Sequence, residues 1–263
     1  MRFSEHLKKA SLVGAFFVSV LLSFSAQALC PVSGALTHVK VAKVIDGDTL
    51  RLADGRSVRL IGLNAPEIGR KGRSAEPFAD AARLRLQALV SASAWQVGMR
   101  SGPEAKDRYG RVLAHVFDEH DNNLEALLLA EGLGFFVAIA PNTQLVSCHR
   151  RAEGKARAAG RGVWRQPPII PAEKLDSGGF AVITGKVERV DVNRGGIWLR
   201  LDGAAVLQIP HEVAASFGSL SHLVGKEIEA RGWVVDRKGR TDLSRHARWL
   251  LKISHPSMLV LPL

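Results

Sequence analysis

The sequence has few cysteines, few aromatic residues and no metal-binding pattern of histidines. Of its 263 residues two are cysteines and one is a tyrosine, and aromatic residues make up 6%. No histidine or aspartate accompanies either cysteine in a recognisable nucleophile arrangement, which argues against a catalytic thiol. His38, His115 and His149 have no metal-ligand spacing, so we expect ordinary core or surface histidines.

The sequence also lacks a second long apolar run after the one at its start. Residues 1–28 combine a positive beginning, a mostly apolar stretch and small residues before an expected cut, as an export signal does. The residues concerned are Arg2, Lys8, Lys9, Leu12 to Phe24, Ala26 and Ala28. We expect cleavage of this signal, export to the periplasm or secretion, and no stable membrane insertion afterwards. An uncleaved anchor is the alternative, because the run is nearly long enough to span a membrane.

Both cysteines, Cys30 and Cys148, lie beyond the expected cut. In an oxidising compartment an even pair favours one disulfide. It would close a loop of about 120 residues and stabilise the fold by about 4 kcal/mol in the chain-entropy model. Two independent buried thiols are the alternative.

The chain is basic, with 36 Lys and Arg against 25 Asp and Glu and a net charge of +11. Without residues 1–28 the balance is 33 against 24, or +9. Such a charge favours polyanionic partners, DNA and RNA among them, through neutralisation of phosphates and release of counterions. A merely soluble basic surface is the other interpretation.

Acidic residues gather in one stretch, Val44 to Glu67. Asp46 and Asp48 precede an Asp54-Gly55 pair that lies between the strand-like segments Thr49–Leu52 and Ser57–Leu63. Asp-Gly in this setting predicts a hairpin with a type I′ turn.

This hairpin would bring Asp48 near Asn64 and Glu67, with Arg59 between them. Hard oxygen donors beside a guanidinium suit divalent-metal chemistry on a phosphodiester. The alternative is that Asp46-Gly47-Asp48 forms only a turn. Likewise, Arg59 alone could merely pair with a buried carboxylate, and Arg111 could be a surface residue.

Three motifs, IDGDT, VRLIGLNAPE and DRYGR, occur in this order, and the chain resembles the staphylococcal nuclease (thermonuclease) family over about residues 39–164. The resemblance implies a five-stranded OB-fold barrel and an endonuclease that hydrolyses DNA, RNA or both with low sequence preference. It also implies 3′-phosphate products and a calcium cofactor, with Mg²⁺ or Mn²⁺ as other candidate ions.

The resemblance further assigns roles to residues. The metal ligands would be Asp48, the Asn64 side chain and the Ala65 backbone carbonyl, with Asp46 in the outer shell. Glu67 matches the proposed general base. Arg59 and Arg111 match the arginines that clamp the phosphate.

Two departures from the family pattern affect these expectations. Asn64 stands where the type member has an aspartate, so the site loses one negative charge and its metal affinity should fall. Ala138 and Ala140 stand where the family has two nucleotide-binding tyrosines, so contact with bases should be weaker. Basic loops and the only tyrosine would hold substrate instead, through Arg70, Lys71, Arg73, Arg108 and Tyr109.

Asn64 also leaves a second hypothesis open. The chain could be a catalytically silent nucleic-acid-binding protein of two barrels, or an envelope scaffold whose second domain contacts protein. We favour the nuclease, because the other residues of the catalytic set are present.

The fold class predicted for the whole chain is mainly β with helices (α+β), in two barrels. The nuclease domain would span residues 29–165, with strands at 37–45, 95–99 and 112–117 besides the hairpin, and helices at 77–90, 124–131 and 143–159. Residues 101–110 would form a polar loop. Proline-rich residues 166–179 would form a linker.

Residues 180–263 would form a second small OB-like barrel. Its predicted strands are 181–190, 196–201, 205–209, 227–235 and 248–253, with a helical stretch at 212–217. Asn193 and Arg194 fall near where Asp46 and Asp48 would be, so this domain lacks the acidic set. We expect a non-catalytic nucleic-acid or protein contact module, with any protein partner unknown. A packing domain without a ligand is the alternative.

Overall fold

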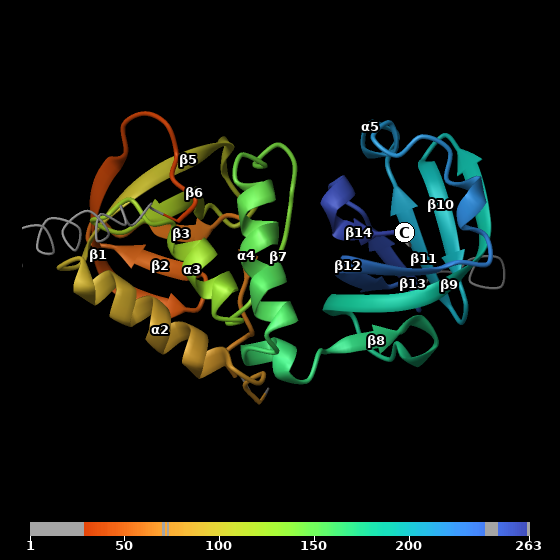
Figure 1. The fold of residues 1–263 in the computed structure, drawn as a ribbon, viewed down its shortest axis with the longest axis horizontal. Helices are drawn as coiled ribbons and strands as arrows, with labels where there is room; N and C mark the ends of the chain where they lie inside the picture. The colour runs from red at the N-terminus through yellow and green to blue at the C-terminus, as the bar shows by residue number, and fades with distance from the viewer. Residues whose placement is uncertain (1–28, 70–71, 73, 240–246, 262–263) are drawn as a thin grey trace, which may run out of the picture.

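The computed structural model describes residues 29–69, 72, 74–239 and 247–261, which form two β-barrels side by side (Figure 1). Residues 1–28, predicted as an export signal, and the predicted substrate contacts Arg70, Lys71 and Arg73 lie outside the described residues. The predicted class, mainly β with helices, is confirmed.

Five strands close the first barrel in the order β1-β2-β3-β6-β5. Their bounds are β1 Thr37–Asp46, β2 Thr49–Leu52, β3 Ser57–Leu60, β5 Gln96–Lys106 and β6 Val112–Phe117. β3 and β6 run parallel, and the other neighbours are antiparallel. Alternating residues such as Leu50, Leu52, Val58 and Leu60 fill the interior. This arrangement confirms the predicted OB-type barrel.

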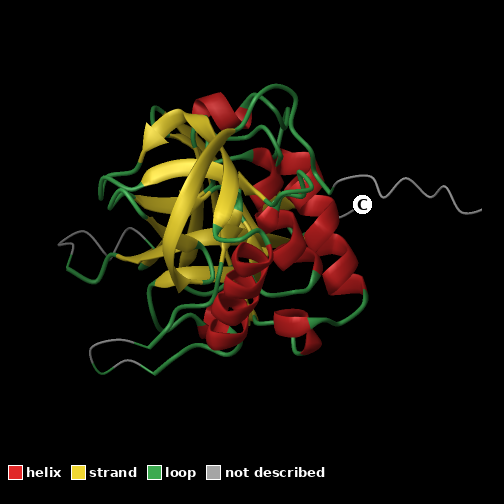
Figure 2. Ribbon diagram, turned by 90° about the vertical axis from the view of Figure 1, so that its left-hand side faces the viewer, coloured by secondary structure: helices red, strands yellow, loops and turns green. Residues whose placement is uncertain are grey.

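Helices lie against the outside of this barrel, to one side of the strands in Figure 2. They are α2 Ala79–Ala92, α3 Leu124–Ala130 and α4 Val146–Ala158, followed by the short helix η1 Gly162–Arg165. A two-stranded ribbon pairs β4 Leu63–Asn64 with β7 Phe135–Phe136. Among the described residues, no helix combines the length and the apolar character needed to cross a membrane.

Two local predictions for this domain are wrong. The β2–β3 hairpin is present, but only Gly55 in its turn has a positive φ, of 87°. The Leu52 backbone N–H donates to the Arg56 carbonyl, and the Gly55 backbone N–H donates to the Leu52 carbonyl. This is a three-residue loop with glycine in the left-handed region, not a type I′ turn. The predicted loop over residues 101–110 is also mostly strand, because β5 continues to Lys106 beside β6.

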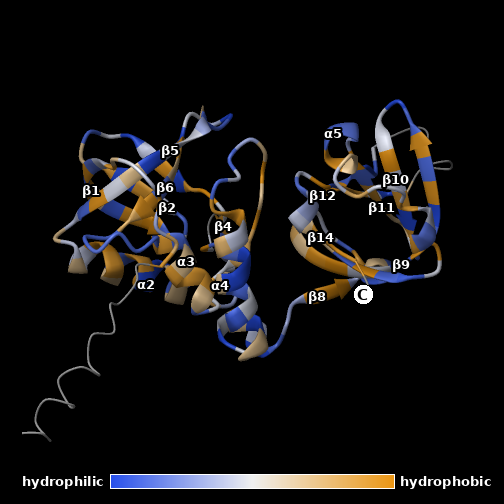
Figure 3. Ribbon diagram, turned by 45° about the horizontal axis from the view of Figure 1, so that its top comes forward, coloured by the Kyte–Doolittle hydropathy of each residue, from blue (hydrophilic) through white to orange (hydrophobic). Residues whose placement is uncertain are grey.

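The second barrel repeats the strand order of the first. Its strands are β9 Gly179–Asn193, β10 Gly196–Leu201, β11 Ala205–Ile209, β12 Glu227–Asp236 and β13 Trp249–Lys252. They pair in the order β9-β10-β11-β13-β12, and β12 returns to β9, with β11 and β13 parallel. Apolar residues lie along these strands, whereas the connecting loops are mostly hydrophilic (Figure 3).

Short elements complete this half of the chain. They are α5 His211–Ala214, η3 Ser221–Leu223, η4 Pro256–Met258 and β14 Leu259–Val260, the last of which pairs with β12.

The segment predicted as a linker, residues 166–179, is partly built into the second sheet. β8 Ile169–Pro171 pairs in parallel with β9, and η2 Ala172–Lys174 follows it directly. Residues 169–174 therefore have regular structure within the segment predicted to link the two barrels. Its prolines allow an edge strand, because such a strand needs hydrogen-bond donors on one side only.

Helix α4 ties several parts of the first domain together. Cys148 on this helix forms the predicted disulfide with Cys30. The next residue, His149, is buried and bonds the Asn123 side chain at 2.8 Å. Burial, and then the nearby charge of His115, lower the pKa of His149 to about 3. His115 and His149 are thus core histidines, as expected.

The same helix also joins the two barrels through buried charges. Glu153 on α4 accepts bonds of 2.8 and 2.6 Å from the Arg231 guanidinium on β12, and one of 2.8 Å from the Phe136 backbone N–H. The Arg231 and Glu153 side chains are only 4% and 5% exposed. One turn further along α4, Arg157 pairs with Glu229 of β12 at 2.6 Å.

We predict that Arg231→Met destabilises the protein by about 3 to 5 kcal/mol, because it leaves the Glu153 carboxylate buried without its cation. Denaturant unfolding monitored by circular dichroism measures the change. Arg189→Met is the matched control, since Arg189 pairs with Asp191 on an exposed surface of the same barrel and should cost less than about 1 kcal/mol. Equal losses in both variants would show that the buried pair has no special role.

Candidate active site

The turn between β1 and β2 carries Asp46, Gly47 and Asp48 at one end of the first barrel. A Cβ atom on Gly47 would lie 2.6 Å from the Cβ of Ala65 and 2.7 Å from that of Ala82. Only glycine fits between these two side chains. The turn is therefore held close to Ala65, the residue whose carbonyl was assigned to the metal.

Asp48 is the centre of the bonded cluster. Its Oδ2 accepts from the Ala65 backbone N–H at 2.9 Å and pairs with the Arg59 guanidinium, while its Oδ1 accepts from the Thr49 hydroxyl at 3.0 Å. Arg59 Nη2 also donates to Asn64 Oδ1 at 3.1 Å. The structure thus brings Asp48, Arg59, Asn64 and Ala65 together, as predicted.

Asp46 adjoins this cluster and accepts the Asp48 backbone N–H at 3.1 Å. Burial, and then the negative charge of Asp48, raise the pKa of Asp46 to about 6. Two carboxylates, an amide oxygen and a backbone carbonyl are the donors that a hard divalent cation prefers. A cation would also offset the repulsion between the two acids, so this donor set fits one.

The candidate metal ligands nevertheless carry little negative charge. No group of three or more His, Cys, Asp or Glu side chains that could hold a metal exists in the described part of the chain. Asn64 contributes an oxygen without a negative charge, and Arg59 brings a positive charge to the same two side chains. A weakly held metal ion is therefore expected here.

Glu67 lies on the exposed segment that follows β4. Its backbone N–H donates to Glu76 Oε2 at 2.9 Å, and the Glu76 backbone N–H donates to the Glu67 carbonyl at 3.0 Å. These two bonds hold Glu67 and Glu76 next to each other. They leave the Glu67 carboxylate exposed to solvent.

Arg111 directly precedes strand β6. β3 and β6 pair in parallel with Arg59 opposite Leu113, so the two-residue period of the strand places Arg111 on the same face as Arg59. Arg111 Nε donates to Asp107 Oδ2 at 2.7 Å. Although burial opposes it, the bonds from Arg111 and the backbone N–H groups lower the pKa of Asp107. Asp107 therefore stays ionised and orients Arg111.

Tyr109 projects into solvent beside these charges, with its side chain 68% exposed. The guanidinium carbons of Arg108 and Arg111 lie 4.8 and 5.6 Å from the centre of its ring. The predicted substrate contacts Arg108 and Tyr109 thus adjoin Arg111. Arg70, Lys71 and Arg73, the other predicted contacts, lie outside the described residues.

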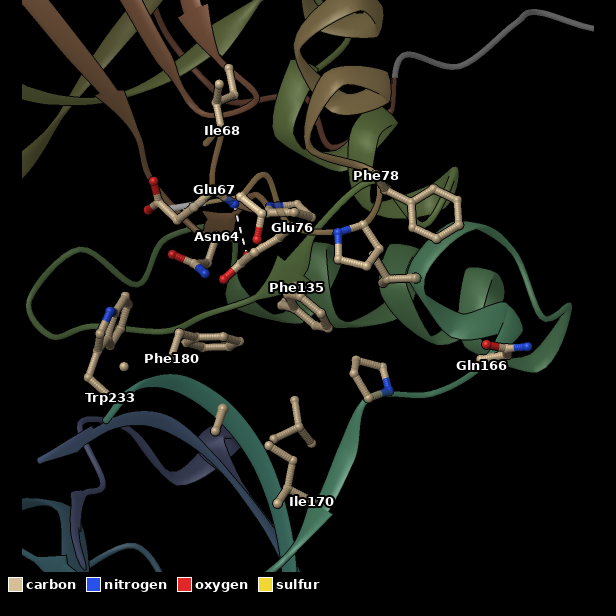
Figure 4. Close-up of a pocket in the computed structure, with 18 of the residues that line it drawn as sticks. Asn64, Glu67, Ile68, Glu76, Phe78, Phe135, Gln166, Ile170, Phe180 and Trp233 are labelled. Atoms are coloured by element: carbon tan, nitrogen blue, oxygen red, sulfur yellow. Dashed lines mark hydrogen bonds between the residues drawn. The ribbon is translucent and has the colours of Figure 1, made fainter. Parts of the chain in front are cut away.

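A cavity of about 1310 Å³ opens between the two barrels beside this site. Asn64, Glu67 and Glu76 line one side, and Phe180 and Trp233 of the second barrel line the other (Figure 4). Phe180, Trp233 and Glu76 are not among the site residues predicted from the sequence. The predicted strands 181–190 and 227–235 include Trp233 but not Phe180, and the sequence pattern did not show which of their residues face the first barrel.

Comparisons with known proteins agree with this geometry. Residues 57–166 match the family described as staphylococcal nuclease homologue. The chain is 30% identical over 129 residues to a thermonuclease of Staphylococcus intermedius, covering 48% of this chain and 75% of that protein. It is also 30% identical over 161 residues to an uncharacterized endonuclease of Haemophilus influenzae, covering 59% of this chain and 81% of that protein.

A further relative is endonuclease YncB of Bacillus subtilis, which is 29% identical over 139 residues. The match covers 51% of this chain and 65% of YncB, so the chain spans less than two thirds of that protein. With its closed five-stranded barrel and bonded acid–arginine cluster, the chain belongs to the staphylococcal nuclease family.

We predict that Asn64→Asp strengthens calcium binding by about tenfold or more, because it places a third carboxylate beside Asp48 and Asp46. Isothermal titration calorimetry with CaCl₂ measures the affinity. Asn193→Asp is the control, since it makes the same charge change at the matching turn of the second barrel. An equal gain in both variants would mean that net charge, not the site, governs binding.

Proposed function

We propose that this protein is a divalent-metal-dependent nuclease that hydrolyses phosphodiester bonds in DNA, RNA or both with little sequence preference. One observation carries the proposal. Asp48, Arg59, Asn64 and Ala65 form one bonded cluster, with Arg111 on the same face of the neighbouring strand. The printed names of the relatives, endonuclease and thermonuclease, support the same activity.

The arginines would bind the scissile phosphate. A guanidinium has five N–H donors in a planar fork. Arg59 and Arg111 therefore have more donors than their bonds to Asp48, Asn64 and Asp107 use. Two such forks can bond several phosphate oxygens and offset the charge that develops as the bond breaks. The proposed product carries a 3′-phosphate, as the family resemblance implies.

Glu67 would take the proton from the attacking water, since its carboxylate is exposed at the edge of the cavity. Asp48, the Asn64 side chain and the Ala65 carbonyl would hold a divalent cation, with Asp46 behind them. When bound, that cation supplies positive charge to the phosphate. Calcium fits this all-oxygen donor set, with Mg²⁺ and Mn²⁺ as alternatives.

We predict that Glu67→Gln lowers cleavage of single- and double-stranded DNA and RNA by about a hundredfold or more, because the variant has no group to accept the proton. Arg59→Ala should cause a similar loss through the phosphate contacts. Initial rates with Ca²⁺, Mg²⁺ or Mn²⁺, and with EDTA, measure the effect.

Glu119→Gln and Arg56→Ala are the matched controls, since both residues are exposed outside the cluster and should keep full activity. Circular dichroism must show that all four variants are folded. If the unmodified protein cleaves no substrate with any of these ions but still binds strands, it is a silent nucleic-acid-binding protein and the nuclease proposal is wrong.

We also propose that the protein acts outside the cytoplasm, in the periplasm or as a secreted protein. The signal-like residues 1–28 support this, and so does the disulfide between Cys30 and Cys148, a bond that persists in oxidising compartments. We predict that the protein isolated from expressing cells begins at Leu29. N-terminal sequencing of the periplasmic and medium fractions tests this, and a chain that retains Met1 in the cytoplasm would contradict it.

A further inference from the structure

The second barrel forms one wall of the cavity beside the candidate active site. Asn64 and Glu67 line this cavity from the first barrel, and Phe180 of β9 and Trp233 of β12 line it from the second. Its volume of about 1310 Å³ exceeds the roughly 300–1,000 Å³ typical of small-molecule pockets. The size suits a section of a polymer rather than a small ligand.

A row of aromatic rings extends from the β4–β7 ribbon of the first barrel to this wall of the cavity. Asn64 on β4 pairs directly with Phe135 on β7. The Phe135 ring lies 5.3 Å from that of Phe180, which in turn lies 5.3 Å from the Trp233 ring. Figure 4 shows these rings side by side below Asn64 and Glu67. The row therefore begins at a candidate metal ligand and ends at an open face of the second barrel.

Trp233 is placed to receive a ligand. Phe180 and Trp233 are partners in the β9–β12 ladder, which fixes their relative position by backbone hydrogen bonds. Trp233 remains 42% exposed although it is a large apolar side chain. An ordered indole that packs on one neighbour and leaves its other surface open is a suitable platform for stacking.

Charge is distributed unequally over the cavity. The residues that the second barrel contributes are apolar or glycine, and none is charged: Gly179, Phe180, Ala181, Val182 and Trp233. The charged lining residues lie elsewhere: Glu67 and Glu76 on the first barrel, and Arg165 at the end of η1. The Asp48–Arg59 cluster lies beyond Asn64. Such a wall would not hold phosphates, but it matches the uncharged faces of nucleobases.

We propose that Phe180 and Trp233 form a base-stacking subsite, through which the second barrel holds unpaired bases of a single strand next to the scissile phosphate. This inference rests on the proposed nuclease function and names its preferred substrate, single-stranded nucleic acid. Paired bases are excluded, because stacking on the side chains requires bases whose faces are free. The two barrels thus bind one strand together.

The test measures binding separately from cleavage. Fluorescence anisotropy with fluorescein-labelled mixed-sequence 12-mers of single-stranded DNA and RNA, in EDTA at low salt, gives the dissociation constant of the full chain. We expect Trp233→Ala to weaken binding roughly five- to a hundredfold, the range of a lost base–aromatic stack. Trp233→Phe should keep most of the affinity, and Phe180→Leu should lose affinity while it keeps the packing on Phe135.

Two control variants locate the contact. Val235→Ala alters an exposed side chain on the same face of β12, two residues further along and outside the cavity. Trp198→Ala removes an indole from β10, on another part of the barrel. Both should bind as the unmodified protein does. Unchanged affinity in Trp233→Ala and Phe180→Leu, or a loss only in Trp198→Ala, would overturn the inference.

The outcome is independent of catalysis. A protein that cleaves nucleic acid but whose affinity does not depend on Trp233 keeps its proposed function and loses this subsite. A protein that cleaves nothing but binds strands through Trp233 loses the nuclease proposal and keeps the subsite. Duplex DNA of the same sequence serves as a third probe, and its affinity should not respond to Trp233→Ala.

Discussion

The buried ion pair between Glu153 and Arg231 is the interaction on which the relation of the two barrels depends. A carboxylate and a guanidinium so far from water are stable only while both are present and fully bonded. Here the carboxylate also holds the Phe136 backbone N–H, so the pair fixes β12 against the ribbon that contains Asn64. The position of Trp233 relative to the candidate active site follows from that constraint.

The two barrels share a strand order but differ at the turn between their first two strands. In the first barrel this turn carries Asp46 and Asp48, and in the second Asn193 and Arg194 occupy the corresponding stretch. The Asn193 side chain there bonds the Trp198 indole and the Gly195 backbone, which makes it part of the turn itself. The same strand arrangement therefore holds an acidic cluster in the first barrel. In the second barrel the Asn193 side chain at the matching position bonds groups of its own hairpin.

Sequence patterns predicted what depends on neighbours along the chain. Strand β6, strand β11 and the β2–β3 hairpin follow from alternation and an Asp-Gly pair. The acid–arginine cluster follows from three motifs, of which DRYGR lies well beyond the other two in the sequence. Apart from the disulfide between Cys30 and Cys148, most contacts between distant segments escaped prediction. Residues 169–171 look like a linker because their strand exists only through pairing with β9. From the sequence alone, Phe180 and Trp233 are typical of core residues. Only the position of the first barrel shows that they line a cavity. The pairing of Arg59 with a buried carboxylate, which the sequence left open, is present, since its partner is Asp48.

The two attachments on helix α4 determine how the protein would transmit a pulling force. Cys148 carries the covalent bond to Cys30, and Glu153 carries the buried ion pair with Arg231 of the second barrel. These residues are five positions apart, or about 7.5 Å along the helix axis. A pulling force applied between Cys30 and strand β12 would therefore pass through less than two turns of one helix. The hydrogen-bonded ladders of the first barrel would carry little of that load.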